Sequence, residues 1–134
     1  MLDRLFVYGT LMRGFDNPMA RLLSEGAECL GAATILGRLY RIRHYPGLVE
    51  PRNPADVVYG EVFRMRQPRE LLLRLDDYES CTEAYPEPRE YRREIADVTL
   101  HSGAAVSAYV YIYNWDVAGL PHIASGRFQP DSAG

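Results

Sequence analysis

One short stretch near the N-terminus limits the folds open to this chain, because it is an apolar strand that stops at a glycine. The run Leu5-Phe6-Val7 is long enough for a buried strand, and Tyr8-Gly9-Thr10-Leu11 follows it directly. A strand that ends in a glycine turn leaves several backbone N–H groups unpaired, and such groups bind anions or carbonyl oxygens. The stretch therefore predicts either an N-terminal strand with an ordinary turn or a strand that ends in a binding loop.

Length and composition indicate one globular domain. The chain has 134 residues, of which 47% are hydrophobic and 25% charged, as in ordinary globular proteins. This length allows a substantial core but is too short for two domains. We expect a single domain over residues 1–128 and a loose C-terminal tail over residues 129–134.

Charge and apolar patterning argue against two classes of partner. The net charge is −3 and the isoelectric point is near 5.6, whereas a nucleic-acid-binding face is basic. Arginines alternate with acids in the run Arg89–Glu94, which predicts a solvated surface. No apolar run reaches the roughly 20 residues of a membrane helix, and the N-terminus lacks the pattern of a signal peptide. We expect a cytoplasmic protein that binds neither nucleic acid nor a membrane.

The spacing of the cysteines and histidines predicts neither a metal site nor a reactive thiol. The two cysteines, Cys29 and Cys81, lie far apart, and the three histidines share no metal-ligand spacing. Cys81 has no histidine placed in sequence to act as its base, so we interpret it as an ordinary thiol. Ser102 fits a Ser-Gly hairpin turn. We expect no metal and no cofactor.

Two helices are predicted from capping residues and apolar spacing. Asn17 is a good cap for a helix that begins at Pro18 and ends near Gly26. Pro68 begins a second helix that runs to about Glu79.

Four further strands are predicted from alternating patterns, namely residues 28–42, 57–65, 91–100 and 105–115. Gly31 and Gly37 predict bends or bulges within the first of these, which suit a curved sheet. His44–Gly47 is a turn by composition, and residues 80–90 form a loop. The order of elements, with the last two strands suited to antiparallel pairing, predicts an α+β domain.

The second helix carries the most informative acidic residue. At about 100° per residue, one apolar stripe contains Leu71, Leu72, Leu75, Tyr78 and Glu79, whereas Arg74 and Asp77 point away. The Glu79 carboxylate is then either bent out to water at the helix end or partly buried in a pocket. Partial burial disfavours the charged form and raises the pKa toward the range useful for proton transfer.

The last predicted strand is apolar on both faces. Val106, Ala108, Val110 and Ile112 alternate with Tyr109, Tyr111, Tyr113 and Trp115. Such a strand is covered on both sides, or one of its faces lines an aromatic cavity. Core packing accounts for most of these tyrosines.

The motif Tyr8-Gly9-Thr10-Leu11, with Gly14 shortly after, resembles the signature loop of the gamma-glutamylcyclotransferase-like proteins (the AIG2-like group). Further pieces match in the expected order: Tyr45-Pro46-Gly47-Leu48, Gly60-Glu61-Val62-Phe63, Leu75-Asp76-Asp77-Tyr78-Glu79, Tyr91-Arg92 and Ser125-Gly126. The matches extend from Phe6 to Gly126, and within the family the chain resembles the short gamma-glutamylamine cyclotransferase type. The resemblance implies a small, mixed, largely closed β-barrel flanked by two or three helices, with a pocket at its mouth. It also implies that His44–Gly47 is a loop near this pocket, whereas composition alone is equally consistent with a plain turn.

The same resemblance implies the chemistry. In the family, the α-amine of a gamma-glutamyl group attacks its own side-chain amide, which closes 5-oxoproline and releases an amine or amino acid. Glu79 matches the acidic residue that the family uses as general acid and base, and Tyr8, Gly9, Thr10 and Leu11 match its substrate-binding loop. Metal and cofactor are not needed, and the expected partner is a small gamma-glutamyl substrate, bound by a monomer or a small homo-oligomer. A protein of the same fold that binds a small ligand without turnover is the alternative, and a domain whose pocket has no metabolite role is a third.

Overall fold

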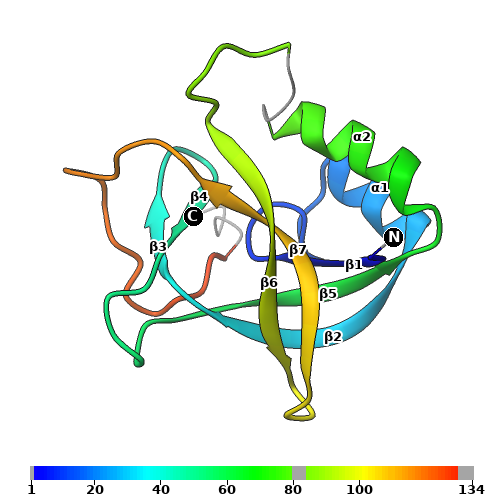
Figure 1. The fold of residues 1–134 in the computed structure, drawn as a ribbon, viewed down its shortest axis with the longest axis horizontal. Coiled ribbons are helices and arrows are strands. Elements are labelled where there is room, and N and C mark those ends of the chain that lie inside the picture. The colour runs from blue at the N-terminus through cyan, green and yellow to red at the C-terminus, as the bar shows by residue number, and fades with distance from the viewer. Residues whose placement is uncertain (1, 80–83, 130–134) are drawn as a thin grey trace.

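The computed structural model describes residues 2–79 and 84–129, and Figure 1 shows how its helices and strands are arranged. In chain order they are β1 (Arg4–Val7), α1 (Pro18–Gly26), β2 (Ala27–Leu36), β3 (Arg38–Arg41), β4 (Pro46–Val49), β5 (Val57–Met65), α2 (Pro68–Tyr78), β6 (Tyr91–Leu100) and β7 (Ala105–Tyr113). The predictions made for Cys81, for the beginning of the loop 80–90 and for all but the first residue of the tail lie outside the described residues.

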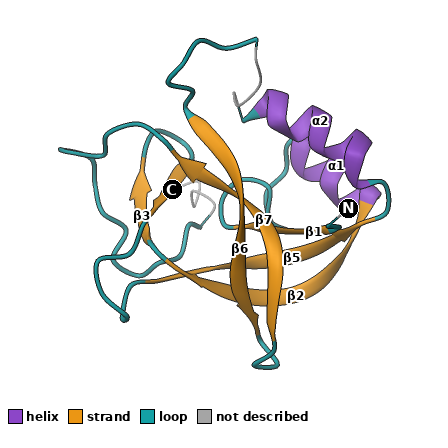
Figure 2. Cartoon of the chain, viewed as in Figure 1, coloured by secondary structure: helices purple, strands orange, loops and turns teal. Residues whose placement is uncertain are grey.

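Five strands close into a barrel in the order β1-β5-β2-β6-β7 (Figure 2). Neighbouring strands are antiparallel except β1 and β7, which run parallel and close the barrel. The predicted antiparallel pairing of the last two strands is confirmed, with Tyr91 opposite Tyr113 and Thr99 opposite Ala105. The α+β class and the small mixed barrel are therefore confirmed.

The two helices lie together on one side of the barrel (Figure 2). α1 begins as predicted, because the Asn17 side chain accepts a hydrogen bond from the Ala20 N–H at 2.8 Å and Pro18 occupies the first turn. α2 also begins at a proline, and its predicted apolar stripe is buried at Leu71, Leu72 and Leu75. These leucines fix which side of α2 faces the barrel.

β1 is buried on both faces, which explains its continuous apolar sequence. Leu5 and Val7 belong to a core cluster that also contains leucines from both helices. Phe6 and Tyr8 belong to a second cluster built from β2, β5, β6 and β7 residues. Because side chains alternate along a strand, this short segment joins the two clusters and then delivers the glycine loop.

The predicted strand over residues 28–42 is wrong in part, since it is two strands that separate at Gly37. β2 stays in the barrel, whereas β3 leaves it and pairs with β4 in a separate two-stranded sheet. A Cβ atom at Gly37 would lie 2.5 Å from Leu48 Cδ1 and 3.0 Å from the Val49 carbonyl oxygen, so any larger residue would require Leu48 to move and would crowd the backbone of β4. The predicted bulge at Gly31 is confirmed, with φ at +117° and a register shift after Cys29.

The prediction of a turn at His44–Gly47 needs a similar correction. Pro46 and Gly47 already belong to β4, and the turn that joins β3 to β4 covers residues 42–45. Gly47 is a strand residue because it pairs with Tyr40 of β3. Glycine suits this position because the Tyr113 ring packs on it: a Cβ atom there would lie 2.7 Å from Tyr113 Cγ. Composition identified the break in the chain but not the strand that follows it.

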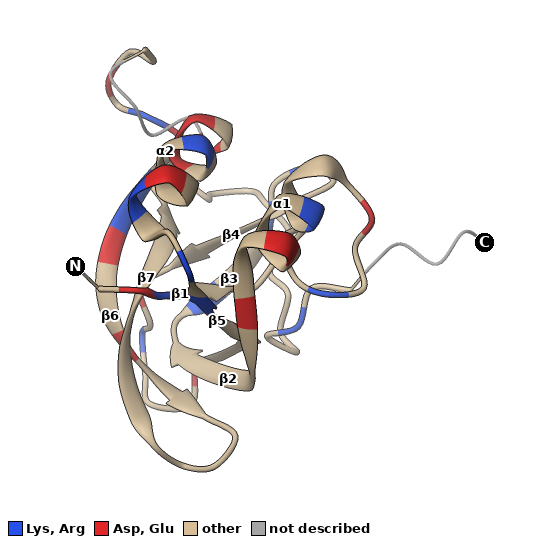
Figure 3. Cartoon of the chain, turned by 90° about the vertical axis from the view of Figure 1, so that its right-hand side faces the viewer, with Lys and Arg blue, Asp and Glu red and all other residues tan. Residues whose placement is uncertain are grey.

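Acidic and basic residues are interspersed along the ribbon in Figure 3, with both signs on each helix. Within the described residues, no helix is long and apolar enough to cross a membrane.

Candidate active site

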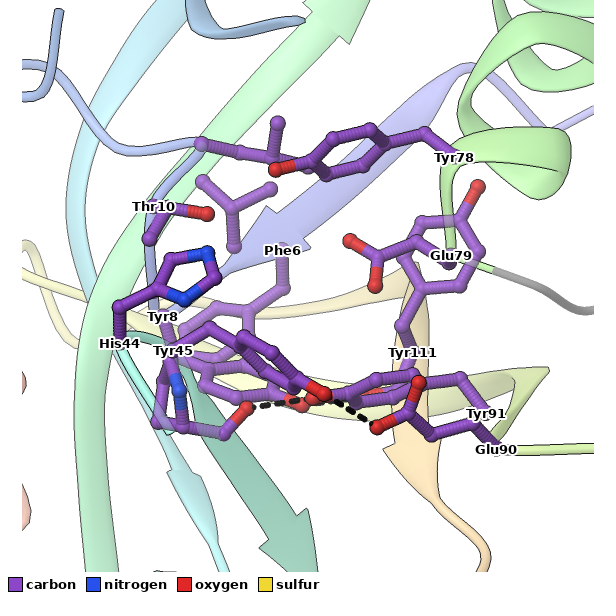
Figure 4. A pocket seen from close by; sticks show the side chains of 14 residues that line it. Phe6, Tyr8, Thr10, His44, Tyr45, Tyr78, Glu79, Glu90, Tyr91 and Tyr111 are labelled. Atoms are coloured by element: carbon purple, nitrogen blue, oxygen red, sulfur yellow. Dashed lines mark hydrogen bonds between the residues drawn. The ribbon is translucent and has the colours of Figure 1, made fainter. Parts of the chain in front are cut away.

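A cavity of about 220 Å³ lies where the loop after β1 meets the C-terminal end of α2 (Figure 4). The segment between β3 and β4 and the beginning of β6 complete its wall. Tyr8, Gly9, Thr10, Leu11 and Glu79 all line it, so the fold brings every site residue predicted from the sequence to one place. This volume is below the roughly 300–1,000 Å³ of pockets for drug-sized ligands, and it therefore suits a small metabolite.

The loop is held in place by two close backbone approaches. A Cβ atom at Gly60 of β5 would lie 2.2 Å from the Val7 carbonyl oxygen, so glycine is required where β1 ends. A Cβ atom at Gly9 would lie 2.8 Å from Cδ and Cγ of Pro46. Gly9 is not among the glycines with positive φ. The sequence favoured conformational freedom as the reason for this glycine, and the structure replaces that reason with contact against Pro46.

The loop carbonyls are paired but its N–H groups are not. The Gly9 carbonyl accepts from the Met12 N–H at 3.1 Å, and the Thr10 carbonyl accepts from the Asn17 side-chain amide at 2.9 Å. The N–H groups of Gly9, Thr10 and Leu11 donate to no acceptor among the described residues. Consecutive unpaired N–H groups in a fixed loop form a site for a carboxylate or an oxyanion.

The far end of the loop is anchored to β5. The Glu61 carboxylate accepts from the Arg13 backbone N–H at 2.8 Å and from Arg13 Nε at 3.1 Å. Gly60 and Glu61 therefore act on the two ends of the same loop, which explains why this dipeptide accompanies the loop motif.

Glu79 directly follows the last residue of α2, and its N–H donates to the Leu75 carbonyl at 2.9 Å. Its side chain points into the cavity and is partly buried, which decides between the two placements left open by the helical count (Figure 4). Its carboxylate has no hydrogen-bond or ion-pair partner among the described residues. Burial, and then the negative charges of Glu90 and Asp76, raises the pKa of Glu79 from 4.5 to about 8. A neighbouring acid, Asp77, is exposed on the outer side of the helix.

We call Tyr8, Tyr91 and Tyr111 the floor of the cavity, and the hydroxyl of each donates a hydrogen bond within the protein. Tyr8 donates to the Tyr111 carbonyl at 2.6 Å and accepts from the Leu48 N–H at 3.2 Å. Tyr91 donates to the Pro46 carbonyl at 2.6 Å. Burial raises the pKa of Tyr8 and of Tyr91 far above that of an exposed tyrosine, so both stay neutral.

A charged pair positions the end of α2 one helical turn before Glu79. Asp76 accepts from Tyr111 Oη at 2.8 Å and from Arg93 at 2.9 and 3.1 Å. These bonds tie α2 to β6 and β7. They correct the expectation that the run 89–94 is entirely solvated surface, since Arg93 is paired and Tyr91 is buried.

Several cavity residues were not predicted as site residues: His44, Tyr45, Tyr78, Glu90, Tyr91 and Tyr111. Tyr45 and Tyr91 stand within the motif pieces, but nothing in the pieces gave their side chains a role. The aromatic-cavity alternative for the last strand holds for Tyr111 and not for Tyr109, Tyr113 or Trp115, which lie outside the cavity lining. Glu90 had no sequence signal, because it stands in the mixed-charge run.

Comparison with known proteins agrees with this geometry. The family model described as "Gamma-glutamyl cyclotransferase, AIG2-like" matches residues 5–130, and the chain belongs to that family. A protein of Methanocaldococcus jannaschii, provisionally named a gamma-glutamylcyclotransferase, is 30% identical over 112 residues, covering 84% of this chain and 85% of its own.

Two solved structures have the same fold. The crystal structure of a mouse AIG2-like protein superposes with a TM-score of 0.71 at 23% identity, covering 99% of this chain and 98% of that one. The crystal structure of YkqA from Bacillus subtilis has a TM-score of 0.71 at 25% identity and covers 96% of this chain. This chain spans only 40% of YkqA, so the match to that protein concerns one part of it.

Proposed function

We propose that this protein closes gamma-glutamyl groups to 5-oxoproline and releases an amine or amino acid. Family membership supports an activity of this general type. The observation that carries the specific proposal is Glu79. Its carboxyl group has no partner among the described residues and a pKa of about 8, and it lies in a cavity whose opposite wall offers N–H groups that are unpaired among those same residues.

The reaction rearranges bonds within one substrate. The α-amine nitrogen attacks the carbon of the side-chain amide, a ring C–N bond forms, and the C–N bond to the leaving amine breaks. One proton leaves the α-ammonium group and one is delivered to the leaving nitrogen. Neither oxidation nor reduction occurs, so proton transfer and charge stabilisation are the whole requirement.

Glu79 supplies the proton transfers. A group whose pKa lies near the working pH both accepts and releases a proton readily. An α-ammonium group beside the carboxylate favours its ionised form, so substrate binding prepares Glu79 as the base. Once protonated, the same carboxyl group is the acid that protonates the leaving nitrogen.

The loop supplies the charge stabilisation. Three consecutive N–H groups, from Gly9 to Leu11, are available to hold the substrate α-carboxylate or the oxyanion of the tetrahedral intermediate. The floor tyrosines do not compete for this role, because the hydroxyls of Tyr8 and Tyr91 already donate to backbone carbonyls.

Incubation with a set of gamma-glutamyl amines and gamma-glutamyl amino acids tests the proposal, with 5-oxoproline and the released amine measured by mass spectrometry. We expect both products in equal amounts. Asp77→Asn, on the outer side of α2, is the matched control and should keep the wild-type rate. Calorimetric binding without product would instead establish the ligand-binding alternative.

A further inference from the structure

A second carboxylate faces the cavity and has no role in the reaction described above. Glu90 directly precedes β6, lines the cavity and is partly buried. Its Oε2 accepts a hydrogen bond of 2.5 Å from Tyr45 Oη, which fixes the direction of the carboxylate. Oε1 has no partner among the described residues. Figure 4 shows Glu90 on the same side of the cavity as Glu79, with Thr10 across from both.

The described part of the cavity therefore has acidic groups and no arginine to pair with them. Among the described residues, its lining contains two carboxyl groups, from Glu79 and Glu90, and no arginine. Arg43 lies near Tyr45, but it is exposed and does not line the cavity. A partly buried carboxylate without a cation is costly unless the ligand supplies the positive charge.

The two halves of the substrate have different charge requirements. The glutamyl half carries one carboxylate and one ammonium group, which match the loop N–H groups and Glu79. An orientation with the carboxylate beside Thr10 and the reacting amide beside Glu79 directs the leaving half toward Glu90, because Glu90 lies on the Glu79 side of the cavity, across from Thr10 (Figure 4). In this orientation, the Glu90 carboxylate lies beside the charged end of the leaving amine.

We propose that Glu90, positioned by Tyr45, is a specificity residue that selects gamma-glutamyl substrates whose leaving amine carries a second positive charge, such as the mono-gamma-glutamyl amide of a diamine. Glu90 disfavours leaving amines that carry a carboxylate, as amino acids do. The proposal rests on the proposed cyclotransferase function, and it narrows the substrate class of the same site.

A purely structural interpretation of Glu90 makes a different prediction. If the Tyr45–Glu90 bond only joined the β3–β4 connection to β6, then the charge of Glu90 would not matter. Glu90→Gln separates the two, because the amide oxygen still accepts from Tyr45 Oη while the negative charge is gone. Glu94→Gln is the matched control, since Glu94 lies within β6, which directly follows Glu90, and is outside the cavity lining.

The experiment compares kcat/KM for three substrates that differ only at the end of a shared four-carbon tether: the gamma-glutamyl amides of a butane diamine, of pentylamine and of an aminopentanoate. In the wild type we expect kcat/KM to be highest for the cationic substrate, lower for the neutral one and lowest for the anionic one. Each step should be on the order of tenfold, which lies between the effect of an exposed ion pair and that of a buried one. Glu90→Gln should make kcat/KM nearly equal for the three substrates. Glu90→Lys should reverse the order, whereas Glu94→Gln should keep the wild-type order.

The outcomes are distinguishable. Equal kcat/KM for the three substrates in the wild type, or a uniform loss on all three in Glu90→Gln, overturns the specificity proposal and leaves the cyclotransferase function standing. Absence of 5-oxoproline from all three substrates and from the wider gamma-glutamyl set overturns the proposed function instead. Circular dichroism of each variant confirms that it is folded.

Discussion

The floor and the rim of the cavity treat their polar groups in opposite ways. On the floor, the hydroxyls of Tyr8, Tyr91 and Tyr111 each donate to an acceptor within the protein. On the rim, the N–H groups of residues 9–11 and the carboxylate of Glu79 have no partner among the described residues. Both sets of polar groups line one small cavity. The fold supplies hydrogen-bond partners to the floor groups and, within the described residues, none to the rim groups.

We interpret this difference as one between structural groups on the floor and functional groups on the rim. A buried polar group without a partner costs roughly 1–3 kcal/mol, so a fold selected only for stability would pair it. The floor follows that rule and the rim does not. We infer that the rim is completed by substrate, and each prediction below tests one side of the comparison.

The largest effect is expected for the rim carboxylate. Glu79→Gln keeps the shape of the side chain but removes the acid and base, and loss of such a group lowers the rate by roughly 10²–10⁴. The upper end applies, because one group serves both proton transfers. Turnover of gamma-glutamyl substrates measures it, with Asp77→Asn as the control, and a wild-type rate in Glu79→Gln would place the proton transfers elsewhere.

The pH dependence of stability should change in the same variant. Because the pKa of Glu79 is raised from 4.5 to about 8, the folded state holds its proton more tightly than the unfolded state. Its stabilising contribution is complete below pH 4.5 and is lost as the pH rises to about 8. A glutamine cannot titrate, so Glu79→Gln does not lose this stability as the pH rises. Its urea midpoint should therefore increase relative to that of the wild type between pH 4.5 and about 8. Parallel pH profiles for the two proteins would show that the carboxyl group is not desolvated.

A smaller effect is expected where the rim is built by close contact. Gly9→Val places a branched side chain against Pro46, at a position where even a Cβ atom would lie 2.8 Å from the ring. Such overpacking costs roughly 1–3 kcal/mol, which displaces the loop and weakens substrate binding about 10- to 100-fold. Calorimetry with 5-oxoproline measures it, and Thr10→Ser, which keeps the backbone, is the control. Unchanged affinity in Gly9→Val would remove the loop N–H groups from the site.

The smallest effect on turnover is expected on the floor. Tyr8→Phe leaves the Leu48 N–H and the Tyr111 carbonyl without their partner, which lowers the free energy of unfolding by roughly 1–3 kcal/mol. Tyr59→Phe is the control, since that hydroxyl donates to no described residue. Urea unfolding measures the loss of stability. If Tyr8→Phe stopped turnover without loss of stability, then the floor would be part of the chemistry and the comparison would fail.

Local sequence signals predicted the elements that depend on their own residues. The Asn17 cap, the Pro68 helix start and the limits of β5 and β6 are as expected. The break at Gly37 was not predicted, because it depends on Leu48 and Val49 approaching from another strand. A pattern within one segment holds no information about such a partner.

The site divides in the same way. The glycine loop and Glu79 were predictable because both stand in pieces that resemble the family's motifs, whereas the helical count alone left the Glu79 carboxylate either in water or in a pocket. Tyr45 and Glu90 were not, because they are 45 residues apart and meet only when β6 is in place beside the β3–β4 connection. Their hydrogen bond is a product of the barrel rather than of either segment.

The parallel pairing of β1 with β7 has a consequence for how this protein folds. The bond from Tyr8 to Tyr111 spans 103 positions, so the first strand finds its second neighbour only after nearly the whole chain is available. Contacts so distant in sequence slow folding, because a long segment must be ordered before they form. During synthesis on the ribosome, β1 and its glycine loop can pack against β5 before β7 has emerged, but the barrel stays open until then. The cavity wall that Tyr91 and Tyr111 form is consequently the last to be completed, and a chain without β6 and β7 has no assembled site.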